Sequence, residues 1–269
     1  MAGSQKEITV APLETEAQFR EAVQLQRTIW GFSETDLLPA RFFVVASKVG
    51  GSVLGAFDAA RLVAFCVAIP AIKPGGRAFL HSNMLGVLAG YRDFGLGRRL
   101  KLRQREYALQ AGIPLIEWTF DPLELKNAYF NIERLGAVVR RHVRNQYGIS
   151  SSALHAGLPT DRLTAEWWVG SARADRLCAG EPFGNPPVVD TIAVPNNASA
   201  LRSTDPERVR AIQAELAERF DAAFRNGLTV VGLRRGEEAG EYLLAELPQD
   251  PPPGSAEPDK TSEQPAHEA

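Results

Sequence analysis

The order of elements after residue 78 constrains the fold most strongly. An apolar stretch, FLHSNMLGV (79–87), has the composition of a strand and leads into YRDFGLGRRL (91–100). A basic helical pattern follows and ends at Gly112,. PLIEWTF then predicts a strand, ELKNAYFNIERLG (124–136) a helix and AVVRRHV a further strand. This alternation of strands and helices predicts an α/β protein, of the kind that some schemes class as α+β.

The chain before this alternation predicts a strand, two helices and a hairpin. EITVAPL (7–13) is typical of a short strand, and Thr15 and Gln18 have the spacing of a capping box before a helix that reaches Trp30,. A second helix is predicted around 38–49. VLGAF and LVAFCVAI then form the two strands of a hairpin around a short polar turn,.

Beyond residue 145 the predicted elements are more widely spaced. RLTAEWWV (162–169) and VVDTIAVP predict strands,. A strong amphipathic helix follows, for which Thr204 and Glu207 form a predicted capping box and Asn226 a stop signal,. LTVVGL and EYLLAEL are predicted to pair as a closing hairpin. The tail from residue 249 is rich in proline and acidic residues, and its composition predicts disorder,.

Length, charge and cysteine content narrow the class of protein. A chain of 269 residues buries a substantial core, as one large domain or one domain with an appendage,. A net charge of −2 gives no general argument for nucleic acid or a membrane surface as a partner,. Apolar runs are far shorter than the roughly 20 residues of a membrane span, and the first residues lack the apolar core of a signal peptide,. Two cysteines form neither a disulfide framework nor a metal-ligand set, so we expect no metal and a cytoplasmic location,.

The glycine turn inside YRDFGLGRRL has the properties of an anion site. Gly95 and Gly97 remove side chains where the first backbone N–H groups of a helix point outward without partners,. The helix dipole favours an anion there, and Arg92, Arg98 and Arg99 add positive charge,. A pyrophosphate fits this description. The alternative is an ordinary glycine-containing loop ahead of a solvated basic helix.

Two common nucleotide motifs fit this turn poorly. A dinucleotide-binding fingerprint needs a third glycine where this chain has Leu100, and the acidic residue at about the expected distance, Glu117, lies inside a strand,. A P-loop needs Gly-Lys-Ser/Thr, whereas Gly97 is followed by two arginines,. These two nucleotide folds are therefore not favoured.

The run LGVLAGYRDFGLG resembles the signature of the GNAT superfamily of acyl-CoA N-acyltransferases. In that signature an apolar strand ends in Leu-x-Val and is followed by Arg or Gln, two residues, Gly, one residue, and Gly or Ala; the matching residues here are Leu85, Val87, Arg92, Gly95 and Gly97. Ala89 replaces a proline that is common after the strand. NAYFNIERLG resembles the second family motif, an Asn- and Ala-bearing helix that ends in Leu-Gly.

The resemblance implies a mixed central sheet flanked by helices, whose fourth and fifth strands splay apart to admit the pantetheine arm of the coenzyme. It implies a GNAT-like core over residues 1–145 and an extension over 146–248 that packs on it. Backbone groups near Leu85 and Val87 would hold the arm, and Asn127 would contact it from the other side. The pyrophosphate would bind backbone N–H groups of Arg92, Asp93, Phe94, Gly95, Leu96, Gly97 and Arg98.

Three side chains are candidates for proton transfer. Period-2 alternation places His81 on the same strand face as Leu85 and Val87, where an imidazole suits a general base; the alternative is a structural strand histidine,. Glu117, in an apolar strand, is a second candidate base if burial raises its pKa, or else a side chain at a sheet edge or facing solvent,. The family's proton-donating tyrosine is replaced by Ile132.

Nearby polar and aromatic residues have open roles. Tyr129, almost one turn before Ile132, is the candidate proton donor, with a core position as the alternative,. Asn131 is either a substrate ligand or surface. The basic run RRHVRNQYG (140–148) would attract a carboxylate substrate or the ribose phosphate of the coenzyme, unless it is a solvated strand face. The pair Trp167-Trp168 would wall an acceptor pocket, with one of the two in the core.

The resemblance therefore implies an acyl-CoA N-acyltransferase. It would use acetyl-CoA or another acyl-CoA as co-substrate and a small-molecule primary amine as acceptor, by direct attack on the thioester. Two alternatives stay open: a catalytically weak acyl-CoA-binding or sensing module, which the missing tyrosine favours, and a protein lysine or N-terminal acetyltransferase. No nucleic-acid or membrane partner is implied, and a homodimer is compatible with the sequence.

Overall fold

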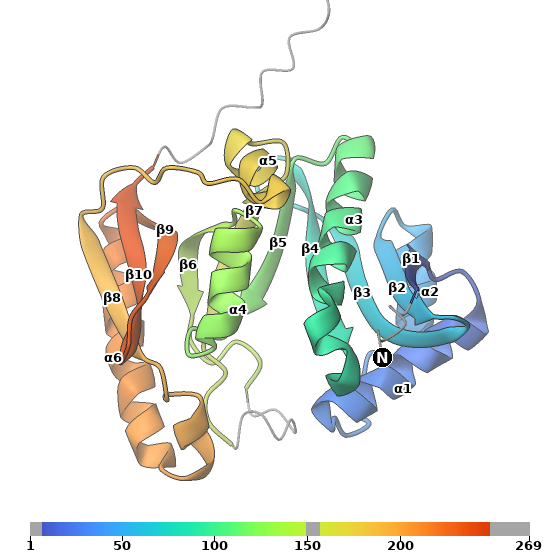
Figure 1. Ribbon diagram of the computed structural model, residues 1–269, viewed down its shortest axis with the longest axis horizontal. Helices are drawn as coiled ribbons and strands as arrows, with labels where there is room; N and C mark the ends of the chain where they lie inside the picture. The colour runs from blue at the N-terminus through green and yellow to red at the C-terminus, as the bar shows by residue number, and fades with distance from the viewer. Residues whose placement is uncertain (1–6, 149–156, 248–269) are drawn as a thin grey trace, which may run out of the picture.

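The computed structural model describes residues 7–148 and 157–247, and the predicted disordered tail lies outside them. The described residues form one ten-stranded sheet in the order β1-β2-β3-β4-β5-β7-β6-β9-β10-β8 (Figure 1). β4 and β5 are parallel, and the other neighbouring pairs are antiparallel. The strands are β1 (Ile8–Pro12), β2 (Ser52–Asp58), β3 (Arg61–Ile72), β4 (Ala78–Val87), β5 (Leu115–Phe120), β6 (Val138–Val143), β7 (Arg162–Trp168), β8 (Asp190–Pro195), β9 (Leu228–Arg235) and β10 (Ala239–Glu246).

Helices flank this sheet, with α3 and α4 on the near face in Figure 1. The α-helices are α1 (Glu16–Trp30), α2 (Ala40–Lys48), α3 (Leu96–Gln110), α4 (Leu125–Tyr129), α5 (Ala172–Ala179) and α6 (Pro206–Arg225). A 3-10 helix, Ala89–Phe94, joins β4 to α3, and a π-helical turn, Phe130–Arg134, continues α4. This mixed α/β architecture confirms the predicted fold class. None of the helices in the described residues is long and apolar enough to cross a membrane.

The starts of α1, α5 and α6 follow from local side-chain chemistry. The predicted capping box of α1 is present. Oγ1 of Thr15 accepts from the backbone N–H of Gln18, and Oε1 of Gln18 accepts from the backbone N–H of Thr15. The predicted box of α6 is wrong by one residue, because Asp205 is the N-cap and its carboxylate accepts from the backbone N–H of Arg208 at 3.0 Å. Aspartate accepts at an N-cap as well as threonine does, so neighbouring candidates were not separable by sequence. Helix α5, capped by Ser171, was not predicted.

The central part of the sheet is not built in chain order. β7 comes from residues beyond 145 and lies between β5 and β6, both of which come from residues before it. β9, β10 and β8 extend the sheet past β6, joined to it by the register pair Val139↔Val230. The sheet therefore runs across residue 145, and the proposed division of the chain into domains at that point stays a prediction.

A bulge in β4 changes which side chains share a face. In the β3–β4 ladder, Ser82 pairs with Ala68 and Met84 with Val67, which leaves Asn83 as an extra residue. An extra residue reverses the alternation of faces. Beyond the bulge, Leu85 faces the cluster formed with α3, whereas His81 is the register partner of Ile69, which packs in the cluster under α1 and α2. The prediction that His81 shares a face with Leu85 and Val87 is therefore wrong.

Candidate active site

The site begins where β4 and β5 separate. Within the described residues their parallel ladder consists of Leu80↔Ile116 and His81↔Glu117. The strands then diverge, in agreement with the splayed fourth and fifth strands that the resemblance implies. We call the end of this ladder, residues 80–82 of β4 and 116–118 of β5, the vertex. Side chains at the vertex alternate between two faces of the sheet, so that Ser82 and Trp118 lie toward α3 and His81 and Glu117 lie on the opposite face,.

On the α3 face, the glycine turn leaves the start of a helix open. Gly95 has a φ of +67°, in the left-handed region, and no side chain within the described residues caps α3. The first backbone N–H groups of α3 are therefore available to an anion, at the positive end of the helix dipole. A Cβ added to Gly97 would lie 3.6 Å from Cδ2 of Leu85. The turn thus packs directly against β4, and a larger side chain at Gly97 would fill the space beside Leu85.

The arginines around the turn differ in their availability. Arg92 is exposed. Arg98 is half-buried and its guanidinium donates to the backbone carbonyl of Cys178 on α5. Arg99 donates to the carbonyl of Ile8 on β1 at 2.5 Å, so its side chain is directed away from the turn. Positive charge beside the turn therefore comes mainly from Arg92 and Arg98.

The other predicted coenzyme contacts have mixed surroundings. Leu96 is fully buried, so only its backbone is available, whereas Phe94 is half exposed. Leu85 and Val87 are partly buried on the α3 face, and Asn127 is exposed on α4. The side chain of Asp93 lies outside what the structure describes. These positions allow the predicted contacts through backbone groups and stay predictions.

The second family motif forms an irregular helix. Ile132 is fully buried in the apolar core, and the ring of Tyr129 has the guanidinium of Arg235 3.6 Å from its centroid. Asn131 is 1% exposed, which excludes the surface alternative, and its Nδ2 has no hydrogen-bond partner. It lies in the π-helical turn, where the N–H of Leu135 donates to the carbonyl of Phe130. Such turns are frequent at functional sites.

On the other face, His81 has the surroundings of a base. Its ring is largely buried, and this desolvation lowers its pKa below the ordinary value for histidine,. Glu117 opposes the shift, and Lys101, Arg141 and Lys73 reinforce it. A lowered pKa keeps the imidazole neutral at pH 7, which is the form that accepts a proton.

Glu117 is buried at the vertex and paired with two cations. Its Oε1 accepts from Nζ of Lys73 at 2.6 Å and from the guanidinium of Arg141 at 2.8 Å. The solvent-facing alternative for Glu117 is therefore wrong. Because Arg141 belongs to β6 and Lys73 to the β3–β4 turn, the carboxylate ties both to the vertex.

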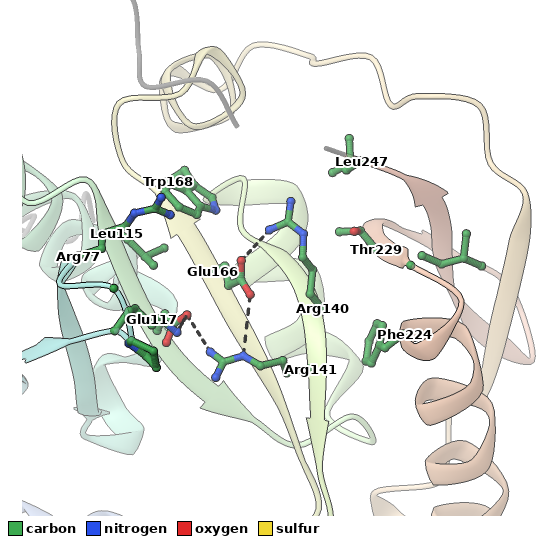
Figure 2. A pocket seen from close by; sticks show the side chains of 15 residues that line it. Arg77, Leu115, Glu117, Arg140, Arg141, Glu166, Trp168, Phe224, Thr229 and Leu247 are labelled. Carbon is green, nitrogen blue, oxygen red and sulfur yellow. Dashed lines mark hydrogen bonds and ion pairs between the residues drawn. The ribbon is translucent and has the colours of Figure 1, made fainter. Parts of the chain in front are cut away.

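A cavity of about 660 Å³ opens beside these residues (Figure 2). Figure 2 shows Arg140 and Arg141 reaching Glu166 and Glu117 across its floor. Its lining residues come from the β3–β4 turn, β5, β6, β7, the junction of α6 with β9, and Leu247 after β10. The charged ones are the cations Lys73, Arg77, Arg140 and Arg141 and the anions Glu117 and Glu166. Two more cations than anions give the cavity an excess of positive charge.

The pair Trp167-Trp168 and the basic run 140–148 each have some side chains at the cavity and others elsewhere. Trp168 lines the cavity, with the guanidinium of Arg77 5.4 Å from its ring, whereas Trp167 is fully buried. One tryptophan of the pair is thus in the core, as predicted. Within the run 140–148, Arg140 and Arg141 face the cavity, but Arg144 binds Asp221 on α6.

Sequence reasoning missed several members of the site. Lys73, Arg77 and Glu166 line the cavity, and Lys101 lies buried at the vertex. Lys73 begins the turn KPGG and Arg77 follows it, and Lys101 belongs to a helix with four arginines, so each looked like an ordinary solvated charge. Only the pairing of β4, β5, β6 and β7 brings them together.

Comparisons with known proteins support the fold. A candidate acetyltransferase from Acinetobacter baylyi ADP1 is similar with a TM-score of 0.51, at 11% identity, covering 63% of this chain and 96% of that chain. This likeness shows a fold shared with that candidate acetyltransferase.

Two further structures are similar at lower scores. A candidate acetyltransferase from Salmonella typhimurium, yncA, solved with acetyl-CoA, has a TM-score of 0.49 at 14% identity over 60% of this chain and 94% of that chain. Arabidopsis thaliana NAA60, solved with a bisubstrate analogue, has a TM-score of 0.48 at 16% identity, over 60% of this chain and 97% of that chain. No protein-family model and no curated protein matches the chain.

Proposed function

We propose that the protein transfers an acyl group from acyl-CoA to a primary amine. One observation carries the proposal: the vertex separates an open helix start on the α3 face from a cationic cavity on the opposite face. The first has the properties of a diphosphate site, and the second is lined by Glu117, the register partner of His81. Two substrates entering from opposite faces would meet at the vertex.

Acyl-CoA fits the α3 face as co-substrate. The backbone N–H groups at the start of α3 would hold its pyrophosphate, with Arg92 and Arg98 as supporting charges,. The arm would extend along Leu85 and Val87 toward the vertex and present its thioester there. The thioester supplies the activated acyl group, and the residues of this chain position it and move protons.

On the opposite face, His81 would take the proton from the attacking amine. Lys73 and Arg141, fixed by Glu117, would hold a negatively charged part of the acceptor. The excess of cations in the cavity supports an acceptor that carries a carboxylate, such as an amino acid. A small-molecule acceptor, a homodimer and a cytoplasmic location stay predictions.

Ligand-dependent thermal stability tests the coenzyme site. Acetyl-CoA or succinyl-CoA should raise the melting temperature of the wild type, because a ligand that binds only the folded state stabilises it. Gly97→Trp should abolish this shift, because its side chain would fill the space beside Leu85. Gly184→Trp, in an exposed loop with no atom within 4 Å of an added Cβ, is the matched control and should retain it.

An unchanged shift in Gly97→Trp would refute the coenzyme site at this turn. Release of free CoA over a panel of amines, with and without a carboxylate, then tests transfer. Wild-type protein that binds acyl-CoA but releases CoA with none of the amines would support the alternative of an acyl-CoA-binding module.

A further inference from the structure

Lys101, on α3, is a buried cation at the vertex. It is 3% exposed, and its Nζ donates to Oγ of Ser82 at 2.8 Å and to Oε1 of Gln104 at 3.2 Å. Nζ also lies 3.7 Å from the centroid of the Trp118 ring. Neutral groups and an aromatic face therefore surround all of its donors. Within the described residues, no carboxylate lies at ion-pair distance from Nζ, so the charge is left without an anionic partner.

The position of Lys101 relative to the two strands is specific. Ser82 directly follows His81, and Trp118 directly follows Glu117, which are the last paired residues of β4 and β5. Nζ thus contacts a side chain of each strand, Ser82 and Trp118, one residue beyond the end of their ladder. It does so on the α3 face, because side chains one residue apart point to opposite faces.

The two faces of the vertex then carry opposite proton-transfer groups. His81, a proton acceptor, lies on the face with the cavity, and Lys101, a proton donor, lies on the face with the glycine turn. In acyl transfer the attacking amine loses a proton and the departing thiolate gains one. An amine that enters from the cavity would lose its proton on the face that carries His81. A coenzyme that lies along Leu85 would have its thiolate on the face that carries Lys101.

The second family motif provides no such donor at the usual place. Ile132 has no polar atom in its side chain and is part of the core. Tyr129 has its ring covered by Arg235 of β9. Burial also lowers the pKa of Lys101 to about 8, because desolvation penalises the charged amine,. Release of its proton to a neighbouring anion removes that penalty.

We propose that Lys101 protonates the departing CoA thiolate, in place of the missing tyrosine. This role depends on the proposed acyl transfer. The amine nitrogen forms a bond to the thioester carbonyl carbon, and the C–S bond breaks with its electron pair on sulfur. A proton from Nζ of Lys101 passes to sulfur, and the amine proton passes to His81. Solvent then returns a proton to Lys101 and removes one from His81, which leaves amide and free CoA.

Two substitutions separate charge from proton donation. Lys101→Met removes both, whereas Lys101→Arg keeps the positive charge on a guanidinium that does not release its proton. Both variants should bind acyl-CoA with a wild-type thermal shift and should lower kcat by about 100-fold or more. Wild-type kcat should fall as pH rises past the pKa of Lys101, and that decrease should be absent from both variants. Lys48→Met, an exposed lysine on α2, should retain wild-type kcat and pH profile.

Several results would overturn the proposal. One is a kcat and alkaline pH profile in Lys101→Met that equal those of the wild type. Wild-type kcat in Lys101→Arg would assign Lys101 to charge stabilisation alone. A changed preference between acetyl-CoA and succinyl-CoA, with the alkaline limb unaltered, would assign it to binding an acyl carboxylate. Mass-spectrometric detection of acylated Lys101 in a single turnover would make it a nucleophile.

The failure of the proposed function is distinguishable from all of these. Absence of an acyl-CoA thermal shift in the wild type would refute acyl-CoA binding itself, and with it the role of Lys101. If Lys101→Arg fails to fold because of its larger side chain, Lys101→Gln supplies a second uncharged variant beside Lys101→Met, and loss of the alkaline limb in both supports the proposal.

Discussion

A buried cation without an anionic partner lowers the free energy of unfolding, and Lys101 makes this cost measurable. Its pKa falls from 10.5 to about 8. Since one pKa unit corresponds to about 1.4 kcal/mol, the protonated amine costs about 3 to 4 kcal/mol of stability. Lys101→Met removes this cost and also the hydrogen bonds to Ser82 and Gln104, worth about 1 kcal/mol each,. We therefore expect Lys101→Met to be about 1 kcal/mol more stable than the wild type at pH 7.

The pH dependence of this difference has a definite sign. The penalty is fully present below the folded-state pKa of about 8, and it decreases as pH rises toward 10.5, where the lysine of the unfolded chain also loses its proton,. The stability of the wild type should therefore rise relative to Lys101→Met between these values. Urea unfolding at a series of pH values, followed by tryptophan fluorescence, measures the difference, with Lys48→Met as the control. A difference that stays constant across this range would refute the assignment of Lys101 as a penalised buried cation.

Two other predictions follow from the helix cap and the vertex. Asp205→Ala should lower the free energy of unfolding by about 1 kcal/mol in the same urea assay, because the N–H of Arg208 loses its acceptor, whereas Thr204→Ala should have a smaller effect,; equal losses would contradict the assigned cap. His81→Gln should lower turnover most strongly below the pH at which the acceptor amine loses its proton unaided, because the lowered pKa of His81 keeps a neutral base present there,. A small loss that is uniform with pH would leave His81 a structural role.

The order of elements was predictable because it depends on local patterns. Short apolar runs bounded by turn residues marked β2 to β7, and Gly31, Gly112 and Gly136, all with positive φ, lie just after helices at the predicted ends. The glycine turn was recognisable because its spacing is a property of a few consecutive residues. Helix α5 was missed because it is short and adjoins a stretch rich in glycine and proline.

The geometry of the site was less predictable because it depends on strand pairing. The extra residue Asn83 leaves the sequence alternation of β4 unchanged but reverses the face of every residue after it,. The ion pairs of Glu117 join residues 44 and 24 positions away in the chain, which no local pattern encodes. Lys101 was hidden in a basic run, where burial of one lysine among arginines that are exposed or only partly buried has no sequence signal.

The position of β7 has a consequence for synthesis of the chain. A nascent polypeptide that has emerged only as far as residue 145 contains β5 and β6 but not the strand that lies between them. Both strands would then expose unsatisfied backbone edges, which favour pairing with other chains. Closure of the central sheet therefore waits for residues 162–168 to leave the ribosome, and expression fragments that end before Trp168 should aggregate.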